Sequence, residues 1–558
     1  MVGSDRRGEK ATMASRRDEL NAYSFARKRT NAAFLKPLPN GSIESAPRPL
    51  KAVLPSVLVG VLILVGFGAC GILKPVAPKG WDEVGKNVIV GDESTTRYVV
   101  LSSKDANGKD QKLLHPVLNL ASAKLLLDPK FQVVKVKESE LDGKLAHGPA
   151  VGIPYAPDRL PGPEDANKAK TWAVCNRPGS GTNSKPQQAV FVLGGKDKDK
   201  VEGRGKLDLH QALYVRDPDG QFWLVDQHGV AFQFSSAPVG TLPSKGKQDN
   251  PQLRRVIFGE AEPQDVTQEW MDTVIKSPMP ISMPTFPGAG RPSSDTDGVP
   301  AEYNKVGMVV EDKASGQKYV VLPDGVKKVS NFIAKLLLTG QNATDLGHSG
   351  SALDAKKLAS TDIKPLEDDK GGAQEYLGTI PNTDIPLPWP SEDVEAANDF
   401  KHPSQTGGLT TPTDSGVSCS VYNGTSTKYP GDAGKYLGFP NGVPDMQTWI
   451  GKDYPAKIAS GSSSYVTPGS GLLYQQVDTG KQKEGPLYLV TDTGLRYFVP
   501  RGNDGAGKAG SDKEERDQAQ LHLGYKGAHP PLILSAWSKL LSAGPQLNVH
   551  DAEKPQAQ

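Results

Sequence analysis

The sequence predicts an α+β fold with a single N-terminal transmembrane helix, followed by a β-rich outer domain of four strand-strand-helix repeats around a central domain. Three observations support this prediction. The chain is apolar and uncharged from Ala52 to Leu73, and no other segment comes near this length. Beyond it, short strand and helix patterns recur, and 60 glycines and 46 prolines indicate many turns.

The apolar stretch 52–73 is long enough to cross a membrane. At about 1.5 Å per helical residue it reaches roughly 33 Å, and a hydrocarbon core is about 30 Å thick. A signal peptide has a short positive region before its apolar part, whereas about 50 residues precede this stretch. We therefore predict an uncleaved anchor, with a buried core helix and lipidation at Cys70 as the less favoured alternatives.

The N-terminal tail carries more basic than acidic residues. Short tails follow the positive-inside rule, whereas long domains cross the membrane largely regardless of charge. The sequence therefore predicts a single-pass protein of the cell membrane, with a cytoplasmic N-terminus and an extracytoplasmic C-terminal domain.

Residues 1–14 are expected to be disordered, and 15–51 to form a cytoplasmic basic helix and linker. Ser15 followed by Asp18 is typical of a capped helix start, and no Gly or Pro interrupts the chain until Pro37. Such a helix can dock on a partner, lie on anionic lipid, or remain solvated. The candidate partner-binding residues are Arg16, Arg17, Leu20, Tyr23, Phe25, Arg27, Lys28 and Arg29.

The outer region contains internal similarity. The sequence AKLLL ends a predicted helix at both 123–127 and 334–338, each after two predicted strands. Two predicted hairpins turn at Gly229 and Gly494, and helices with Trp270 and Trp537 follow at similar spacing. These matches divide the chain into repeat 1 (74–165), repeat 2 with a connector (166–300), repeat 3 (301–345), a central module with an insertion (346–470), repeat 4 (471–550) and a loose tail (551–558).

Cys175 and Cys419 are the only cysteines outside the apolar stretch. On one side of a membrane they suit one disulfide in an oxidising compartment, and two buried free thiols are the alternative. Neither cysteine has a CxxC companion and the nine histidines show no HExxH spacing, so no metal site is expected. A net charge of +2 gives no general attraction for nucleic acid.

Gly502, Gly507 and Lys508 form the one candidate for nucleotide binding, because 502–508 matches GxxxxGK. A P-loop then needs a hydroxyl for Mg²⁺, but Ala509 follows. No catalytic constellation was found, so the residues indicate a non-catalytic outer domain without a cofactor. ATP hydrolysis remains an alternative, as does a cell-wall-binding module that would use Trp223 or Tyr488 in an aromatic groove.

Several longer motifs resemble EccB, the bitopic core component of type VII (ESX) secretion machinery. The resemblance covers nearly the whole chain. It is carried by Ser15–Arg29 (SRRDELNAYSFARKR), Gly71–Pro75 (GILKP), Trp81, Leu114–Asn119 (LHPVLN), Val151–Asp158 (VGIPYAPD), Trp172–Cys175 (WAVC) and Leu489–Gly494 (LVTDTG).

The resemblance implies a structural core component of the secretion complex, anchoring the cytoplasmic ring and multimerising on the outer side. The implied partners are an EccC-type ATPase, EccD-like and EccE-like membrane components, and further copies of the outer domain. It also implies that Cys175 and Cys419 form the family's disulfide. Members of the family have been described as ATPases, so an enzymatic role stays open.

Overall fold

The chain forms two compact units in a computed structural model, Met1–Lys79 and Gly80–Gln558. The structure describes residues 15–35, 50–72, 77–105, 107–179, 185–241, 248–340, 346, 354–411, 415–426, 439, 443–458, 463–478, 482–500 and 518–556. The predicted disordered segment 1–14 lies outside them, as do Gly502, Gly507 and Lys508.

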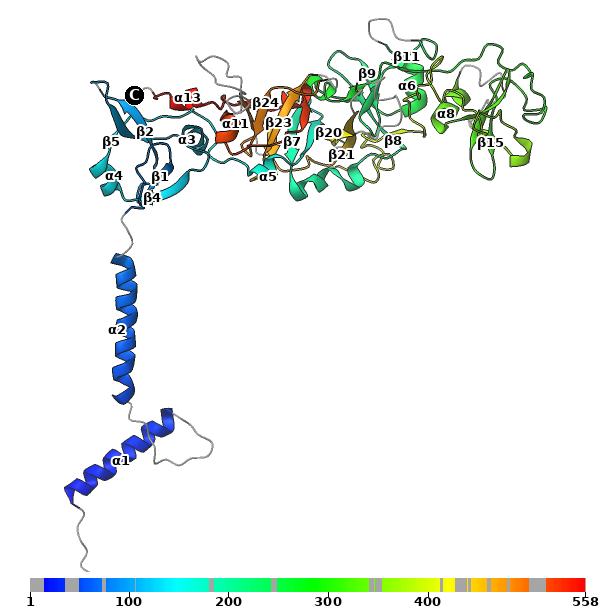
Figure 1. Ribbon diagram of the computed structural model, residues 1–558. Helices are drawn as coiled ribbons and strands as arrows, with labels where there is room; N and C mark the ends of the chain where they lie inside the picture. Colours follow the sequence, from blue (N-terminus) through cyan, green and yellow to red (C-terminus); the bar gives the residue numbers. More distant parts are fainter. Residues whose placement is uncertain are drawn as a thin grey trace, which may run out of the picture. The chain divides into compact units, whose positions relative to one another are not determined.

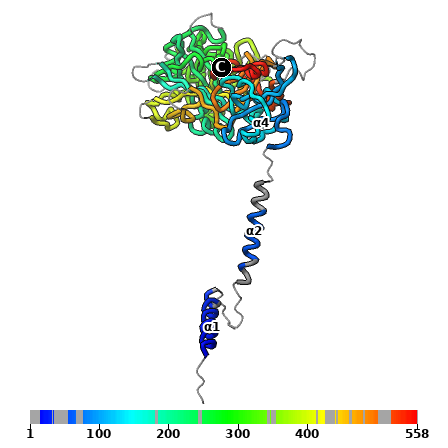
Figure 2. Tube along the Cα trace, turned by 90° about the vertical axis from the view of Figure 1, so that its left-hand side faces the viewer, coloured from blue at the N-terminus to red at the C-terminus, as the bar shows by residue number. Residues whose placement is uncertain are grey.

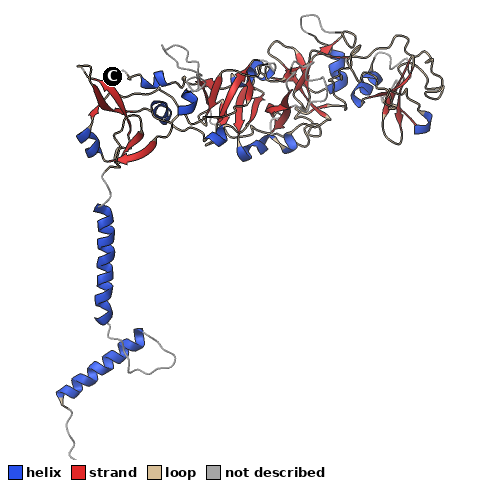
Figure 3. Cartoon of the chain, viewed as in Figure 1, coloured by secondary structure: helices blue, strands red, loops and turns tan. Residues whose placement is uncertain are grey.

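The first unit consists of two helices, α1 (Arg16–Leu35) and α2 (Leu50–Ile72) (Figures 1 and 3). The predicted start of α1 is confirmed, because Ser15 Oγ accepts a bond from Arg17 N at 3.1 Å and Asp18 Oδ2 accepts one from Ser15 N at 3.3 Å. Among the described residues, no helix is both long and apolar enough to cross a membrane.

The second unit begins with a five-stranded sheet of order β4-β1-β2-β3-β5. Its three inner strands are antiparallel, and an edge strand runs parallel to its neighbour on each side. The elements are β1 (Asn87–Gly91), β2 (Arg97–Lys104), β3 (Asp110–Pro116), α3 (Leu120–Leu126), β4 (Gln132–Val136), α4 (Glu138–Lys144) and β5 (Ala146–His147).

Three further sheets have a related strand order: β12-β8-β9-β10-β13, β17-β16-β15-β18 and β26-β23-β24-β25-β27. In each, three antiparallel strands are followed by a strand that pairs in parallel with the first of them. Their strands are β8 (Gln211–Arg216), β9 (Phe222–Val225), β10 (Val230–Phe232), β12 (Gln264–Asp265), β13 (Ile275–Lys276), β15 (Val309–Asp312), β16 (Lys318–Leu322), β17 (Gly325–Val329), β18 (Lys356–Leu358), β23 (Leu472–Val477), β24 (Leu487–Val490), β25 (Leu495–Val499), β26 (Leu532–Leu534) and β27 (Ser542–Ala543).

The prediction of two strands before each AKLLL helix was wrong, because a third strand is present. The third strands are β3 and β17, which lie between the second predicted strand and the AKLLL helix. A polar side chain caps the start of each helix that follows: Asn119 Oδ1 accepts a bond from Ser122 N, and Ser330 Oγ accepts one from Ile333 N, at the start of α8 (Asn331–Thr339).

The two predicted hairpins are confirmed. β9 pairs with β10 and β24 with β25, and Gly229 and Gly494 lie in the turns with φ of 69° and 79°. Such positive φ values favour glycine. Trp270 and Trp537 lie in the short helices α7 (Gln268–Met271) and α12 (Ser535–Ser538), and both are fully buried.

The central sheet has the order β21-β20-β6-β7-β22 and combines two distant parts of the chain. β6 (Thr171–Arg177) and β7 (Gln187–Leu193) fall within the segment that we assigned to repeat 2. They pair with β20 (Val417–Ser426) and β22 (Ser464–Val466), and β21 (Val443–Gly451) lies at the edge. Conversely β19 (Glu395–Ala396), from the predicted central module, pairs with β8.

The C-terminal segment is not a loose tail, in contrast to the prediction for 551–558. Residues Val549–Glu553 form helix α13, Ala552 is fully buried, and Pro555 forms a β-bridge with Val151 of the first sheet. Figures 1 and 2 show this end of the chain beside the first sheet. The sequence is polar here, and its order depends on contacts with distant residues.

Candidate functional site

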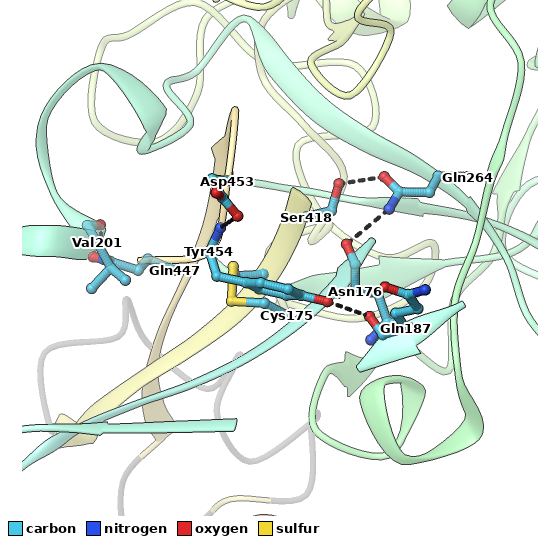
Figure 4. Close-up of a disulfide and its surroundings, with 10 residues drawn as sticks. Cys175, Asn176, Gln187, Val201, Gln264, Ser418, Gln447, Asp453 and Tyr454 are labelled. Carbon is cyan, nitrogen blue, oxygen red and sulfur yellow. Dashed lines mark hydrogen bonds between the residues drawn. A yellow bond between two sulfur atoms is a disulfide. The ribbon is translucent and has the colours of Figure 1, made fainter. Parts of the chain in front are cut away.

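The disulfide between Cys175 and Cys419 lies at the centre of the central sheet (Figure 4). The two residues face each other in the register of the antiparallel strands β6 and β20, and both are fully buried. The bond therefore joins two strands whose residues are 244 positions apart, and it fixes the pairing on which the central sheet depends.

Buried polar side chains beside the disulfide connect the central sheet to the second sheet. Gln264 Nε2 donates to Asn176 O at 3.0 Å, and Gln264 Oε1 accepts from Ser418 Oγ at 2.6 Å. Asn176 Oδ1 accepts from Thr267 N at 3.0 Å, ahead of α7. Because unsatisfied buried polar groups are costly, this network fixes the position of the second sheet (Figure 4).

The edge of the central sheet carries a second set of contacts. Tyr454 OH donates to Gln187 O at 2.8 Å, and the Arg177 guanidinium lies over the Tyr454 ring, 4.7 Å from its centroid. Arg177 also forms an ion pair with Asp453. These contacts join the end of β6 and the start of β7 to the segment that follows β21.

An ion pair with a buried lysine and a half-buried aspartate connects the central sheet to the fourth sheet. Lys170, whose side chain is 2% exposed, donates to Asp165 Oδ1 at 2.7 Å, and Asp165 Oδ2 accepts from Ser470 Oγ and Gly471 N at 2.9 and 3.0 Å. Burial alone would raise the pKa of Asp165, but these donors together hold it below its usual value. Asp165 lies in the short helix α5 (Pro163–Ala166).

The β9–β10 turn contacts the central sheet through Asp226. Its Oδ1 accepts from His228 N and Val230 N at 2.9 and 2.8 Å, and its backbone oxygen accepts from Thr448 Oγ1 at 3.0 Å. Burial raises the pKa of Asp226 to about 6, against the opposing effects of His228 and the backbone donors.

Helix α1 presents the candidate partner-binding residues to solvent. Leu20, Tyr23 and Phe25 are 70%, 71% and 60% exposed. At 3.6 residues per turn, Leu20, Tyr23 and Arg27 share one face, and Phe25 lies on the opposite side. Arg16, Arg17, Lys28 and Arg29 are also exposed and add positive charge around the helix.

The described residues give no support for a metal centre, since among them no three His, Cys, Asp or Glu side chains are grouped to hold an ion. The nucleotide-binding candidate lies outside the described residues, so its prediction stays untested. Sequence reasoning missed the Gln264 network because its partners are distant in sequence. It missed the Asp165–Lys170 pair because these two residues, although close in sequence, form no recognisable local motif.

Comparison with solved structures defines the fold class. One chain of an intact ESX-5 inner membrane complex is 19% identical and aligns with a TM-score of 0.50, over 99% of this chain and 97% of that one. The EccB3 dimer from the ESX-3 core complex is 20% identical with a TM-score of 0.50, over 84% of this chain and 99% of that one. The α+β fold is therefore that of ESX membrane-complex components.

The sequence comparisons identify the family. A family described as "Type VII secretion system ESX-1, transport TM domain B" matches residues 12–556. The ESX-3 secretion system ATPase EccB3 of Mycobacterium tuberculosis is 26% identical over 528 residues, covering 90% of this chain and 83% of that protein. The ESX-2 secretion system ATPase EccB2 of the same organism is 25% identical over 516 residues, covering 87% and 86%. The chain belongs to the EccB family, and the predicted resemblance is confirmed.

Proposed function

We propose that this protein is a structural core component of a type VII secretion membrane complex. The observation that supports this most is the family match over residues 12–556, which includes both helices and nearly the whole outer unit. The similar chains of known structure come from an ESX-5 inner membrane complex and an EccB3 dimer. The central sheet and its contacts suit a scaffold, because their polar groups serve to hold sheets together.

In this proposal α2 is the single membrane anchor. It has 23 residues, and Val57, Leu58, Val59 and Leu64, which are distributed around the helix, are each more than half exposed in the isolated chain. Exposed leucines and valines on every side of a helix suit a lipid environment. The basic residues before α2 favour a cytoplasmic N-terminus and an outer unit beyond the membrane.

Helix α1 then docks on the cytoplasmic part of the complex. Its exposed Leu20 and Tyr23 beside Arg27 suit a partner with an apolar groove and acidic rim. We assign this role to an EccC-type ATPase or to EccD-like and EccE-like membrane components. The outer unit associates with further copies of itself, in line with the dimer described for EccB3.

We also propose that the four peripheral sheets are copies of one unit arranged around the central sheet. The support is their common topology, in which three antiparallel strands are followed by a strand parallel to the first. The helices α3 and α8 occupy the same place after the third strand, and both contain AKLLL or its first residues.

The test is affinity purification of the full-length protein from detergent-extracted membranes, beside a variant that lacks Arg16–Phe34. We expect the intact protein to bring a large complex with an ATPase and a multispan membrane protein, and the variant to lose them. The matched control lacks residues 2–13, which leaves the Ser15 cap and α1 in place. An intact protein that elutes alone and monomeric would refute the assignment.

ATP hydrolysis is the second candidate, because the relatives EccB3 and EccB2 are named ATPases. It predicts nucleotide binding that is lost in Lys508→Ala. The cell-wall-binding alternative has less support, since Trp223 is 7% exposed with its indole N–H bonded to Asp217 Oδ2, and Tyr488 packs between Tyr474 and Phe498.

A further inference from the structure

The first and last sheets of the outer unit lie against each other although they are far apart in sequence. Ala121 and Leu125 of α3 share one buried core with Leu473, Leu489 and Tyr497 of the last sheet. Helix α11 (Gln518–His522) also packs against α3. This junction therefore joins the first sheet of the outer unit to the last one.

The ends of the two helices exchange polar contacts. Lys124 Nζ donates to Leu523 O at 3.3 Å, just beyond α11, and His522 Nδ1 lies 2.6 Å from Leu127 O, at the end of α3. The carbonyls at helix C-termini carry partial negative charge and lack partners within the helix. Each helix thus supplies a polar side chain to the free end of the other.

A second junction uses the same lysine position. Lys335 occupies the place of Lys124 in the other AKLLL sequence, and its Nζ donates to Ile257 O at 3.4 Å, in the last turn of α6 (Pro251–Phe258). It also forms an ion pair with Asp393. Helix α8 of the third sheet therefore meets α6 of the second as α3 meets α11.

The two junctions differ in how the chain connects them. The second and third sheets are consecutive in sequence, so the chain between β13 and β15 ties them covalently. The first and last sheets are not consecutive in sequence, so no short connecting segment joins them. Instead, the C-terminal segment that follows the last sheet contacts the first sheet. Leu547 N donates to Phe498 O at 2.9 Å, which fixes the segment to the last sheet.

The far end of the segment binds the first sheet. Ala552 of α13 is fully buried in the core shared with α3. Gln556 N donates to Ala150 O at 2.8 Å, and Gln556 Nε2 donates to Gly152 O at 2.6 Å. Apolar burial and backbone pairing together make a specific attachment.

We propose that residues 544–556 are a strap, and that α3 with 150–152 forms a docking surface for this C-terminal segment of the same chain. The strap locks the sheet that follows helix α2 in the chain onto the last sheet. Its release weakens the attachment of the first sheet to the last sheet, which α3 and α11 then maintain alone, while the central sheet and its disulfide stay intact. This inference does not depend on the identity of the secretion partners.

The test is hydrogen exchange of the full-length protein in detergent, compared with a variant that ends at Leu547 and a control that lacks only residues 557–558. Loss of the two Gln556 bonds and of α13 should speed amide exchange in 120–126 and 146–152 by about tenfold or more. Exchange in β6 and β20 should not change. A peptide of residues 544–558, added to the truncated variant, should restore protection.

A point variant keeps the test decisive if the truncated chain does not fold. Ala552→Asp places a charge in the α3 contact and should free the same amides, whereas Glu553→Ala, at an exposed position of α13, should not. Unchanged exchange in 120–126 for Ala552→Asp, or no effect of the added peptide on a folded truncated variant, would overturn the proposal.

Discussion

The Asp165–Lys170 pair should be asymmetric: removing the carboxylate should cost more stability than removing the ammonium. Lys170→Met keeps the apolar stem and leaves Asp165, which is 39% exposed and retains its bonds from Ser470 and Gly471. Asp165→Ala leaves an ammonium that is 2% exposed with one carbonyl partner, Asp165 O at 2.8 Å.

The magnitudes follow from what each variant leaves behind. Breaking a buried pair costs about 3–5 kcal/mol when the remaining charge is buried, so we expect about 3 kcal/mol for Asp165→Ala. Lys170→Met should lower the stability by less, about 1–2 kcal/mol, because the Asp165 carboxylate that remains keeps two donors and access to water. The double variant should cost less than the sum, because the buried charge is gone.

The pH dependence has a definite sign. The pKa of Asp165 is lowered in the folded protein from its usual value of 3.8, so its contribution to stability is present above that value and is lost as the pH falls through the lower, folded pKa. The assay is unfolding of the full-length protein in detergent, followed by tryptophan fluorescence at pH 7 and at lower pH. If Lys170→Met proved as destabilising as Asp165→Ala, the reasoning from the buried ammonium would be refuted.

Three further predictions concern the central sheet. Replacing Cys175 and Cys419 by serine should lower stability by up to about 5 kcal/mol in the chain-entropy model and make denaturant unfolding insensitive to reductant; a wild-type protein equally insensitive would contradict the disulfide. Asp226→Asn should stabilise the protein by about 1 kcal/mol above pH 6, because the raised pKa of Asp226 makes the wild type lose stability as the pH rises through about 6. The gain should vanish below pH 4, and melting temperatures measured across this range test it. Gly205→Ala should destabilise the protein by about 1–3 kcal/mol in thermal unfolding, because a Cβ there would meet the backbone oxygen of Ile450. An unchanged melting temperature would contradict this prediction.

Local sequence patterns were sufficient to predict several elements. Gly229 and Gly494 mark their hairpins because the turns need positive φ, and AKLLL marks two helices because its apolar residues follow a helical period. The start of α1 at Ser15 was likewise predictable from its cap. In each case the deciding interaction lies within a few residues.

The missed features depend on long-range contacts. The chain 171–193 was assigned to a repeat because nothing in it shows that β6 pairs with β20, more than 200 positions away. The polar segment 551–556 is held by distant residues, through burial of Ala552 against α3 and hydrogen bonds from Gln556 to Ala150 and Gly152. Register and pairing between distant strands are set by burial in the folded protein, which a local pattern does not contain.

The central claim is that this protein serves type VII secretion as a scaffold, and protein export tests it most directly. Exported proteins would be measured in the culture medium of strains whose only copy carries either Lys508→Ala or the combined changes Leu20→Asp, Tyr23→Asp and Phe25→Asp. The account predicts normal export with Lys508→Ala and loss of export with the α1 variant, although that variant remains in the membrane. Loss of export with Lys508→Ala in a fully assembled complex would contradict the account and favour the ATPase.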